Sequence, residues 1–282
     1  MTGPSRIPRP SLPPVLLSVS SGKGGTGKSF LASNLAVELA RAGLEVLLVD
    51  ADLGMANLHL LLGVESRASL YQVAVMGLPV WEGAQRCGEG FWFLPGGSGV
   101  EELANLRASE VRFLVSRLRK IRRGLDVILI DTAAGIAYQT TEFLAAADLN
   151  LVVTTPDLTA LTDAYALIKS VRRFNPGCGQ ILTLNRVRNW AEGAAVFERV
   201  AGIARRFLGA DLLPGGWVPE DARVRDSVAL KSPVVVSGPE SAPARCLRRL
   251  ARDIVTLARN RRLERAAELG GEVSEYGAGF RS

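Results

Sequence analysis

The stretch SGKGGTGKSF (Ser21–Phe30) decides the fold, because its Gly-x-x-x-x-Gly-Lys-Ser spacing lies between an apolar segment and an amphipathic one. Glycines in such a loop let successive backbone N–H groups turn toward phosphates, and the helix that follows adds its positive N-terminal end. Lys28 is expected to reach the β- and γ-phosphates, and the Ser29 hydroxyl is expected to bind Mg²⁺. The sequence therefore predicts a nucleotide-binding loop.

The predicted nucleotide contacts extend over the whole loop. They comprise Gly22, Gly24, Gly25, Thr26, Gly27, Lys28, Ser29 and Phe30. The alternative is a glycine-rich turn that arose by chance, but a position between a strand and a helix is the context that the motif requires. One further loop residue, Lys23, is not needed for a phosphate cradle, so its role is a separate question.

Apolar segments of strand length alternate with helical segments along the chain. The expected buried strands are VLLSVS (15–20), EVLLVD (45–50), DVILID (126–131), LNLVVTTP (149–156), QILTLN (180–185) and LLPGGWV (212–218). The expected helices include residues 29–43, residues 109–121 with Ser109 as N-cap, and residues 157–174. This alternation predicts an α/β P-loop NTPase fold, with a mostly parallel twisted sheet and helices on both faces.

We expect one ATPase domain over residues 15–265. A Pro-rich flexible tail would precede it at 1–14, and a C-terminal tail would follow at 266–282. No apolar run approaches the roughly 18 residues of a membrane span, and no targeting segment is expected. The three scattered cysteines indicate neither a disulfide framework nor a metal knuckle, which suits a reducing cytosol.

Three carboxylates follow predicted strands and should therefore lie at the ligand-binding edge of the sheet. Asp131 ends one apolar strand, as a Mg²⁺-anchoring carboxylate should, and Asp50 is a further candidate metal group. Asp50 or Asp52 could orient the attacking water, although either could instead cap a turn. The single histidine, His59, lies in an apolar run where packing is the better interpretation, so serine triads and histidine metal sites are unsupported.

At this point the chain resembles a known family. GKGGTGKS (22–29) is similar to the deviant Walker A motif of the MinD/ParA ATPases. The resemblance implies an ATP- and Mg²⁺-dependent homodimer, in which Lys23 crosses the interface to contact the nucleotide of the partner chain. Lys23 would then be a catalytic residue in trans.

Further segments extend the resemblance over nearly the whole chain. VDADLGMANLHLLLG (49–63) is similar to the first switch region, which implies water activation by Asp52. ILIDTAAGI (128–136) is similar to the second switch region, which implies a place for Asp131 near Mg²⁺. LNRV (184–187) and WVPEDARVR (217–225) resemble adenine-binding segments. The residues implied there are Asn185 as main reader of the base, Arg186 beside it, and Pro219, Glu220 and Asp221 lining the pocket.

Within the family, the chain most resembles the flagellar-number regulators of the FlhG/FleN type. The segments that carry this likeness are residues 50–63, LPGGSGVEELANL (94–106), DTAAG (131–135) and 154–169. MinD and ParA proteins usually have a proline in the second switch, where this chain has Ala133 and Ala134. The likeness implies a partner such as a flagellar GTPase or flagellar regulator. The N-terminus lacks the Asp-Gln-Ala…Leu-Arg segment of many relatives, which puts that particular partnership in doubt.

The segment RCLRRLARDIVTLARNRRLERAAEL (245–269) predicts a long basic helix, with Leu247, Leu250, Ile254, Leu257 and Leu263 on one face. Relatives often end in a helix that binds membrane on dimerisation, and a basic face suits anionic lipid. Packing of the first half on the core is the favoured alternative. We expect a cytoplasmic protein whose basic C-terminal helix allows reversible association with the inner membrane or a cell pole.

The function expected is that of a dimerising regulatory ATPase that hydrolyses ATP slowly and controls the placement or number of a cellular structure. Flagella are the favoured candidate for that structure. A septum-site ATPase of the MinD type is one alternative. Another is a ParA-like partition ATPase that holds nonspecific DNA through the basic surface, since the net charge is +6. A metabolic kinase comes third, because no acceptor-binding constellation is recognisable.

Overall fold

A computed structural model describes residues 12–54, 56–65, 69–97, 106–121 and 124–278, with side chains as far as residue 267. These residues form one eight-stranded sheet in the order β3-β4-β2-β5-β1-β6-β7-β8. Every neighbouring pair is parallel except β3 and β4, so the predicted mostly parallel sheet is confirmed. The strands are β1 Val15–Ser20, β2 Val46–Ala51, β3 Gln85–Arg86, β4 Trp92–Leu94, β5 Val127–Thr132, β6 Leu149–Thr154, β7 Gly179–Val187 and β8 Leu213–Pro219.

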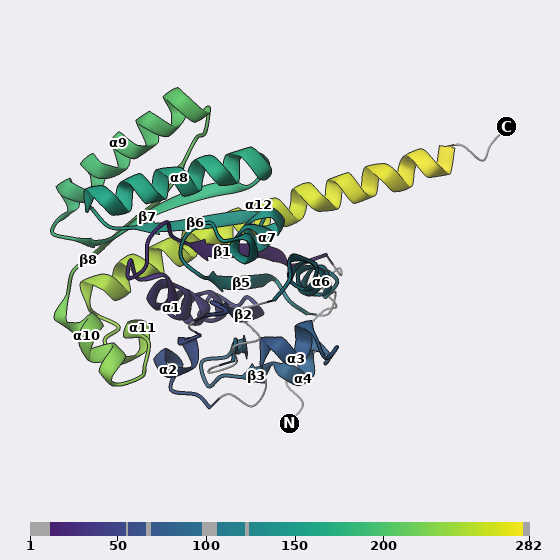
Figure 1. The fold of residues 1–282 in the computed structure, drawn as a ribbon, viewed down its shortest axis with the longest axis horizontal. Coiled ribbons are helices and arrows are strands. Elements are labelled where there is room, and N and C mark those ends of the chain that lie inside the picture. The colour runs from purple at the N-terminus through teal and green to yellow at the C-terminus, as the bar shows by residue number, and fades with distance from the viewer. Residues whose placement is uncertain (1–11, 55, 66–68, 98–105, 122–123, 279–282) are drawn as a thin grey trace.

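Helices cover both faces of this sheet (Figure 1). α1, α11 and α12 pack on one face, and α3, α6, α7, α8 and α9 pack on the other. The helices are α1 Lys28–Arg41, α2 Leu58–Leu62, α3 Leu70–Ala74, α4 Val80–Gly83, α6 Ala108–Arg119, α7 Tyr138–Ala146, α8 Leu158–Phe174, α9 Trp190–Leu208, α10 Ala222–Ala229, α11 Val234–Ser237 and α12 Ala242–Ala278.

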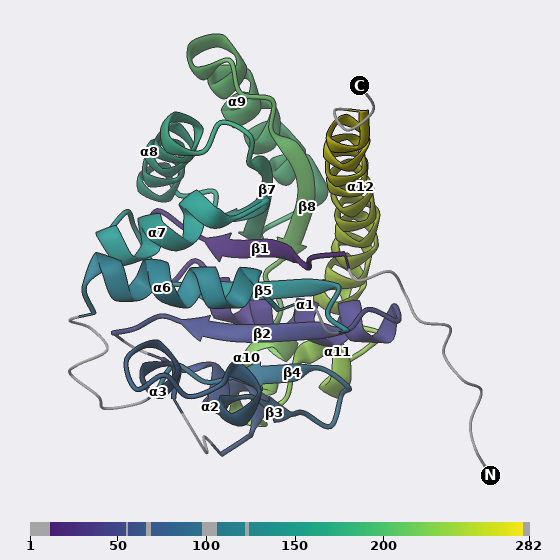
Figure 2. The same ribbon diagram turned by 90° about the vertical axis from the view of Figure 1, so that its right-hand side faces the viewer.

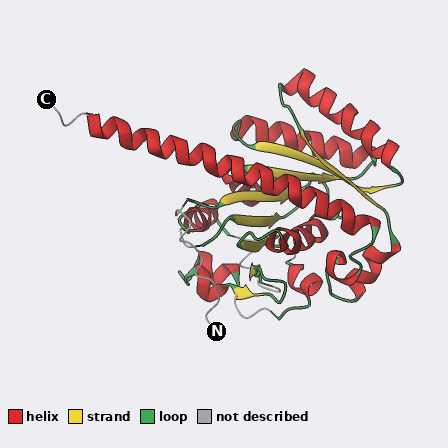
Figure 3. Cartoon of the chain, turned by 180° about the vertical axis from the view of Figure 1, so that it is seen from behind, coloured by secondary structure: helices red, strands yellow, loops and turns green. Residues whose placement is uncertain are grey.

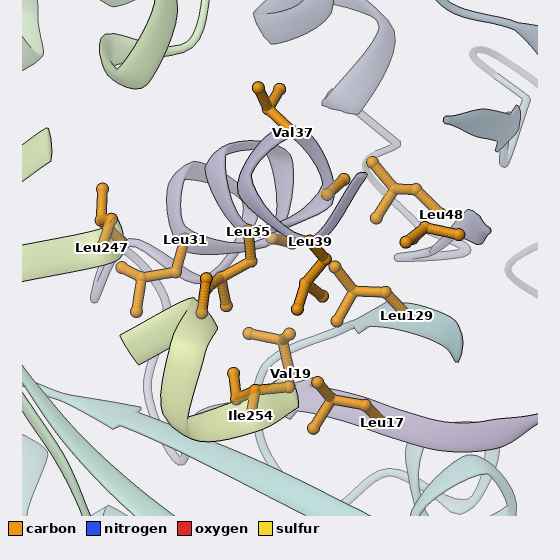
Figure 4. Close-up of a cluster of buried hydrophobic side chains, with 14 of the residues drawn as sticks. Leu17, Val19, Leu31, Leu35, Val37, Leu39, Leu48, Leu129, Leu247 and Ile254 are labelled. Atoms are coloured by element: carbon orange, nitrogen blue, oxygen red, sulfur yellow. The ribbon is translucent and has the colours of Figure 1, made fainter. Parts of the chain in front are cut away.

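The core beneath α1 fixes the position of the phosphate loop. Leu31, Leu35 and Leu39 form one fully buried stripe on α1, as the sequence spacing predicted. Figure 4 shows these side chains pointing toward the strands, with Leu17 and Val19 of β1 among their neighbours. Burying a leucine contributes about 1.5–3 kcal/mol, so this stripe holds the start of α1 firmly against the end of β1.

Two details differ from the sequence-based expectations. α6 begins at Ala108, so Ser109 is not the N-cap. The Glu110 carboxylate accepts a hydrogen bond of 2.7 Å from the backbone N–H of Arg107, which is the N-cap two residues before the predicted one. The short antiparallel hairpin of β3 and β4 was not predicted, because strands of two and three residues carry almost no periodic signal.

α12 is one long basic helix that crosses a face of the sheet and continues beyond it (Figure 3). Leu247, Leu250 and Ile254 are buried, which confirms packing of its first half on the core. Leu263 is 66% exposed and so does not belong to the packed face.

The helix runs without a break past residue 265, so the expected boundary at 265/266 stays a prediction that does not coincide with the end of an element. Most of the expected N-terminal tail, residues 1–11, lies outside the described residues.

Candidate functional site

The predicted site residues come from strands that end at the same edge of the sheet. β1 leads directly into the glycine-rich loop, its neighbour β5 ends near Asp131, and β2, the next strand along, ends near Asp50. On the other side of β1, β7 and β8 end near Asn185 and Pro219. This edge is where open α/β sheets bind ligands.

Backbone geometry shapes the loop as the glycine spacing predicted. Gly25 and Gly27 have φ values of +77° and +99°, in the left-handed region that glycine adopts at little cost. Lys28 is the first residue of α1 and is buried, and the neighbouring Ser29 is half-buried. The loop therefore presents its lysine and serine at the N-terminal end of a helix, where anions are favoured.

Asn185 is attached to the loop across the sheet. Its Nδ2 donates a hydrogen bond of 2.8 Å to the Thr26 carbonyl, and its Oδ1 accepts one of 3.0 Å from the Arg186 N–H. A Cβ placed on Gly27 would lie 2.2 Å from the same Nδ2, so the two residues are in tight contact. The residue predicted to read the base thus also contacts the phosphate loop directly.

The segments expected to line an adenine pocket lie beside Asn185. Val187 pairs with Pro219 in the β7–β8 register, and the Glu220 N–H donates a hydrogen bond of 3.1 Å to the Val187 carbonyl. Asp221 caps α10, because its side chain accepts a hydrogen bond of 2.9 Å from the Arg223 N–H. Arg186, a non-glycine residue with φ of +57°, turns the chain between Asn185 and this segment.

Asp50 and Asp131 form a carboxylate pair, because they are directly opposite in the β2–β5 register. Both are buried, with 1% exposure each. The two oxygens of Asp50 accept hydrogen bonds from the Asp52 N–H at 3.2 Å and the Leu58 N–H at 3.1 Å. Burial, reinforced by Asp131, raises the pKa of Asp50 to about 8.

Asp131 is the more poorly satisfied member of this pair. Burial raises its pKa to about 7, although the nearby Ser29 hydroxyl and Lys28 ammonium act in the opposite direction and Asp52 adds repulsion. Neither carboxylate oxygen has a hydrogen-bond partner of ordinary geometry within the described residues. A buried acceptor without partners costs free energy, which a bound cation would recover.

These features fit a Mg²⁺ ion of the kind that nucleotides carry. Magnesium usually takes one or two protein oxygens and completes its shell with phosphate and water. Ser29 and Asp131 could supply such oxygens directly, with Asp50 behind them. No group of three or more His, Cys, Asp or Glu side chains suited to a metal occurs in the described part of the chain.

Lys23 differs from the other loop residues in where it bonds. It is exposed, and its Nζ donates a hydrogen bond of 3.0 Å to the Thr159 hydroxyl of α8. Gly22 lies against the same helix, since a Cβ there would sit 2.2 Å from the Asp163 backbone. The sequence reasoning did not single out Thr159 or Asp163, because no local signal shows that the start of α8 adjoins the loop.

Phe30 and the second switch segment complete the surroundings of the loop. The Phe30 side chain is buried in the core beneath α1, so only its backbone is available for a nucleotide. The Gly135 N–H donates a hydrogen bond of 2.8 Å to the Ser21 carbonyl. The segment after Asp131 is thereby tied to the start of the loop.

Comparison with known proteins agrees with this geometry. The family model for the CobQ/CobB/MinD/ParA nucleotide binding domain matches residues 17–234. This chain belongs to that family. It is a MinD/ParA-type P-loop ATPase, and its sheet order, loop and carboxylate pair occupy the matched residues.

Two relatives and one solved structure illustrate its place in the MinD/ParA family. The chain is 32% identical to the antiactivator FleN of Pseudomonas aeruginosa, over 86% of this chain and 88% of that protein. It is 35% identical to the flagellum site-determining protein YlxH of Helicobacter pylori, over 67% and 64% respectively. The septum site-determining protein MinD of Pyrococcus horikoshii, solved with Mg-ADP, is 28% identical with a TM-score of 0.74, over 86% of this chain and 97% of that one.

Proposed function

We propose that this protein is an ATP-driven switch that dimerises with ATP and Mg²⁺ bound, hydrolyses ATP slowly and is reset by hydrolysis. The observation that carries the proposal is the position of Lys23. Within one chain its ammonium bonds to Thr159, while Lys28 serves the phosphate loop. A loop lysine that its own site does not use is explained if its target is the nucleotide of a second copy.

The remaining site residues then take the following roles. Lys28 and the loop backbone hold the phosphates, and Ser29 and Asp131 bind Mg²⁺ with Asp50 in support. Asp52, which follows β2 and acts electrostatically on both buried carboxylates, takes the role of orienting the attacking water in this proposal. Asn185, Arg186 and residues 219–221 enclose the base. A slow basal rate is expected, because charge supplied in trans can accelerate such reactions about 10³-fold or more.

The cellular role we propose is control of flagellar number or placement. The support is the likeness to FleN and YlxH over most of the chain. A septum-site role is the alternative, since a putative MinD of Oltmannsiellopsis viridis is 33% identical over 79% of this chain. The partner would be a flagellar GTPase or regulator. Part of the segment 94–106 that carried the branch likeness lies outside the described residues.

The proposed location is the cytoplasm, with reversible association with the inner membrane or a cell pole. No helix in the described ranges is long and apolar enough to cross a bilayer. Association would use the basic surface of α12, and dimerisation would double a weak contact.

Light scattering coupled to gel filtration tests the switch. Wild type and Asp52→Ala should be dimers with ATP, and the dimer of Asp52→Ala should persist. Lys23→Ala should remain monomeric while still binding ATP. Thr159→Ala is the matched control, because it removes the intrachain contact of Lys23 and leaves the lysine in place. Normal dimerisation of Lys23→Ala would disprove the switch.

A DNA-partition role is a second candidate, and the exposed arginines of α12 favour it. Arg249, Arg252 and Arg259 face solvent along the helix. Nonspecific binding through such a row must weaken steeply with salt. A gel-shift assay of DNA with the protein and ATP at two salt concentrations tests this role. The absence of a shift at low salt would exclude it.

A further inference from the structure

An exposed apolar patch lies where α6 runs beside the end of α3, on the opposite face of the sheet from α12 (Figure 2). Val75, Met76 and Phe113 are 41%, 70% and 52% exposed. Single exposed apolar side chains are common on soluble proteins, but contiguous ones mark interaction sites. We call these three residues, with Arg117 and Lys120, the α3–α6 surface.

Arg117 makes the patch contiguous. Its Nη1 donates a hydrogen bond of 2.7 Å to the Val73 carbonyl, and its Nη2 donates one of 3.3 Å to the Gly77 carbonyl. The same guanidinium lies 5.6 Å from the centre of the Phe113 ring. One side chain therefore joins α6 to the turn that carries Val75 and Met76, and brings the three apolar residues onto one surface.

The charge at this surface is positive. Arg117 hydrogen bonds to neutral carbonyl groups, so its charge is not compensated by a carboxylate. Lys120 is exposed and one turn further along, and neither residue has an ion-pair partner in the described ranges. The adjacent acidic residues on α6 and α7, Glu110 and Glu142, are already paired with arginines.

Contacts on both sides also attach α6 to the neighbouring elements. The Tyr138 hydroxyl of α7 donates a hydrogen bond to the Leu106 carbonyl just before α6. Arg112 and Glu142 form an ion pair of 2.6 Å between the same helices. With Arg117 on its other side, α6 is fastened to both neighbours. A preformed surface loses little conformational entropy when a partner binds.

We propose that the α3–α6 surface is a docking site for an acidic amphipathic helix of a partner protein. Apolar side chains of the partner would cover Phe113, Met76 and Val75, and a carboxylate at the edge would meet Arg117 and Lys120. A nucleic acid fits poorly, because the centre is apolar and two uncompensated cations are too few to hold a phosphate backbone. This proposal goes beyond the proposed function and does not depend on dimerisation.

The probe is a set of three designed amphipathic helices with the same apolar face and acidic, uncharged or basic flanking residues. Fluorescence anisotropy with the nucleotide-free full chain gives their affinities, and hydrogen exchange gives their footprints. The acidic helix should bind at least about tenfold more tightly than the basic one, with protection at residues 75–77 and 108–120. Phe113→Ala should weaken that binding about tenfold or more with the melting temperature unchanged, since the ring is half exposed.

Charge reversal supplies the decisive control. Lys120→Glu leaves only Arg117 to offset the new carboxylate, so it should abolish the preference for the acidic helix over the basic one. Arg259→Glu makes the same change of charge on exposed α12 and should leave the order unchanged. Equal binding of all three helices, no binding, or a footprint elsewhere would overturn the proposal. Lys23→Ala should bind the acidic helix normally, so failure of the dimer switch and failure of this docking site are distinguishable.

Discussion

Asp50 and Asp131 face each other from neighbouring parallel strands, and both are almost completely buried. Two carboxylates in one low-dielectric position disfavour ionisation, and the pKa values of about 8 and about 7 express that cost. The fold thus keeps an arrangement that is unfavourable without a cation.

Removing one charge of the pair should stabilise the nucleotide-free protein and impair magnesium use. For Asp131→Asn at pH 8 we expect the free energy of unfolding to rise by about 1–2 kcal/mol, because an ionised buried group becomes neutral. Calorimetric titration with ATP, with and without Mg²⁺, should show that the magnesium-dependent gain in affinity falls at least about tenfold. A destabilised variant with full magnesium dependence would contradict both expectations.

The stability of the nucleotide-free protein should fall between pH 5 and pH 8, in the absence of divalent cations. The folded-state pKa values of Asp50 and Asp131 are raised above 3.8, so the folded chain binds more protons than the unfolded chain in this window. Their contribution is therefore fully present below about pH 4 and is lost as pH rises through about 7 to 8, a loss of about 1–3 kcal/mol. Urea denaturation across the range measures it, and the Asp50→Asn/Asp131→Asn variant should show a flatter profile.

Asn185 should affect nucleotide binding in two ways that can be separated. Asn185→Ala removes the hydrogen bond to the Thr26 carbonyl, so affinity for ATP and GTP alike should fall as the loop loosens. If Asn185 also reads the base, the preference for ATP over GTP should shrink as well. Titration with both nucleotides measures each effect, and unchanged affinity for both would show that neither contact matters.

A methyl group at Gly22 should destabilise the fold far more than one at Gly24. A Cβ on Gly22 would lie 2.2 Å from the backbone of Asp163, whereas nothing lies within 4 Å of a Cβ on Gly24. We expect Gly22→Ala to cost about 1–3 kcal/mol and Gly24→Ala less than about 0.5 kcal/mol. Thermal denaturation without nucleotide compares them, and equal costs would mean that α8 does not press on the loop.

Two ion pairs should hold the second half of α12 on the sheet. Arg262 pairs with Asp126 and Arg265 with Asp148, while the two carboxylates accept 2.9 Å and 2.8 Å bonds from the Glu45 and Leu16 N–H groups. Arg262→Ala/Arg265→Ala removes one arginine from each of two buried carboxylates, while Arg119 stays 3.8 Å from Asp148, and should cost about 1–3 kcal/mol.

Hydrogen exchange should then increase along α12 beyond Ala258, which is the last buried residue among those of α12 with described side chains. Exposed Arg259→Ala is the control and should change neither the stability nor the exchange. Protection equal to that of wild type in the double variant would show that these pairs do not retain the helix.

Local pattern was sufficient for much of this molecule. Strand β1, the loop and α1 were predictable together, because a buried apolar run, a glycine spacing and a leucine stripe each occupy adjacent positions in the chain. The family segments likewise placed Asp131 at the end of a strand. The sequence was less informative for α6, whose start depends on a cap from Glu110, and for the β3–β4 hairpin, whose strands are too short to show a period.

The sequence by itself therefore determined the phosphate loop and the alternation of strands and helices. It also showed that the loop carries a second lysine, Lys23, in addition to Lys28. Only the tertiary structure decided that Asp50 stands opposite Asp131, that Asn185 holds Thr26, and that Lys23 reaches Thr159. The physical reason is that strand order and helix docking are set by burial of apolar faces summed over the whole chain. Contacts between residues far apart in sequence leave no trace in local periodicity.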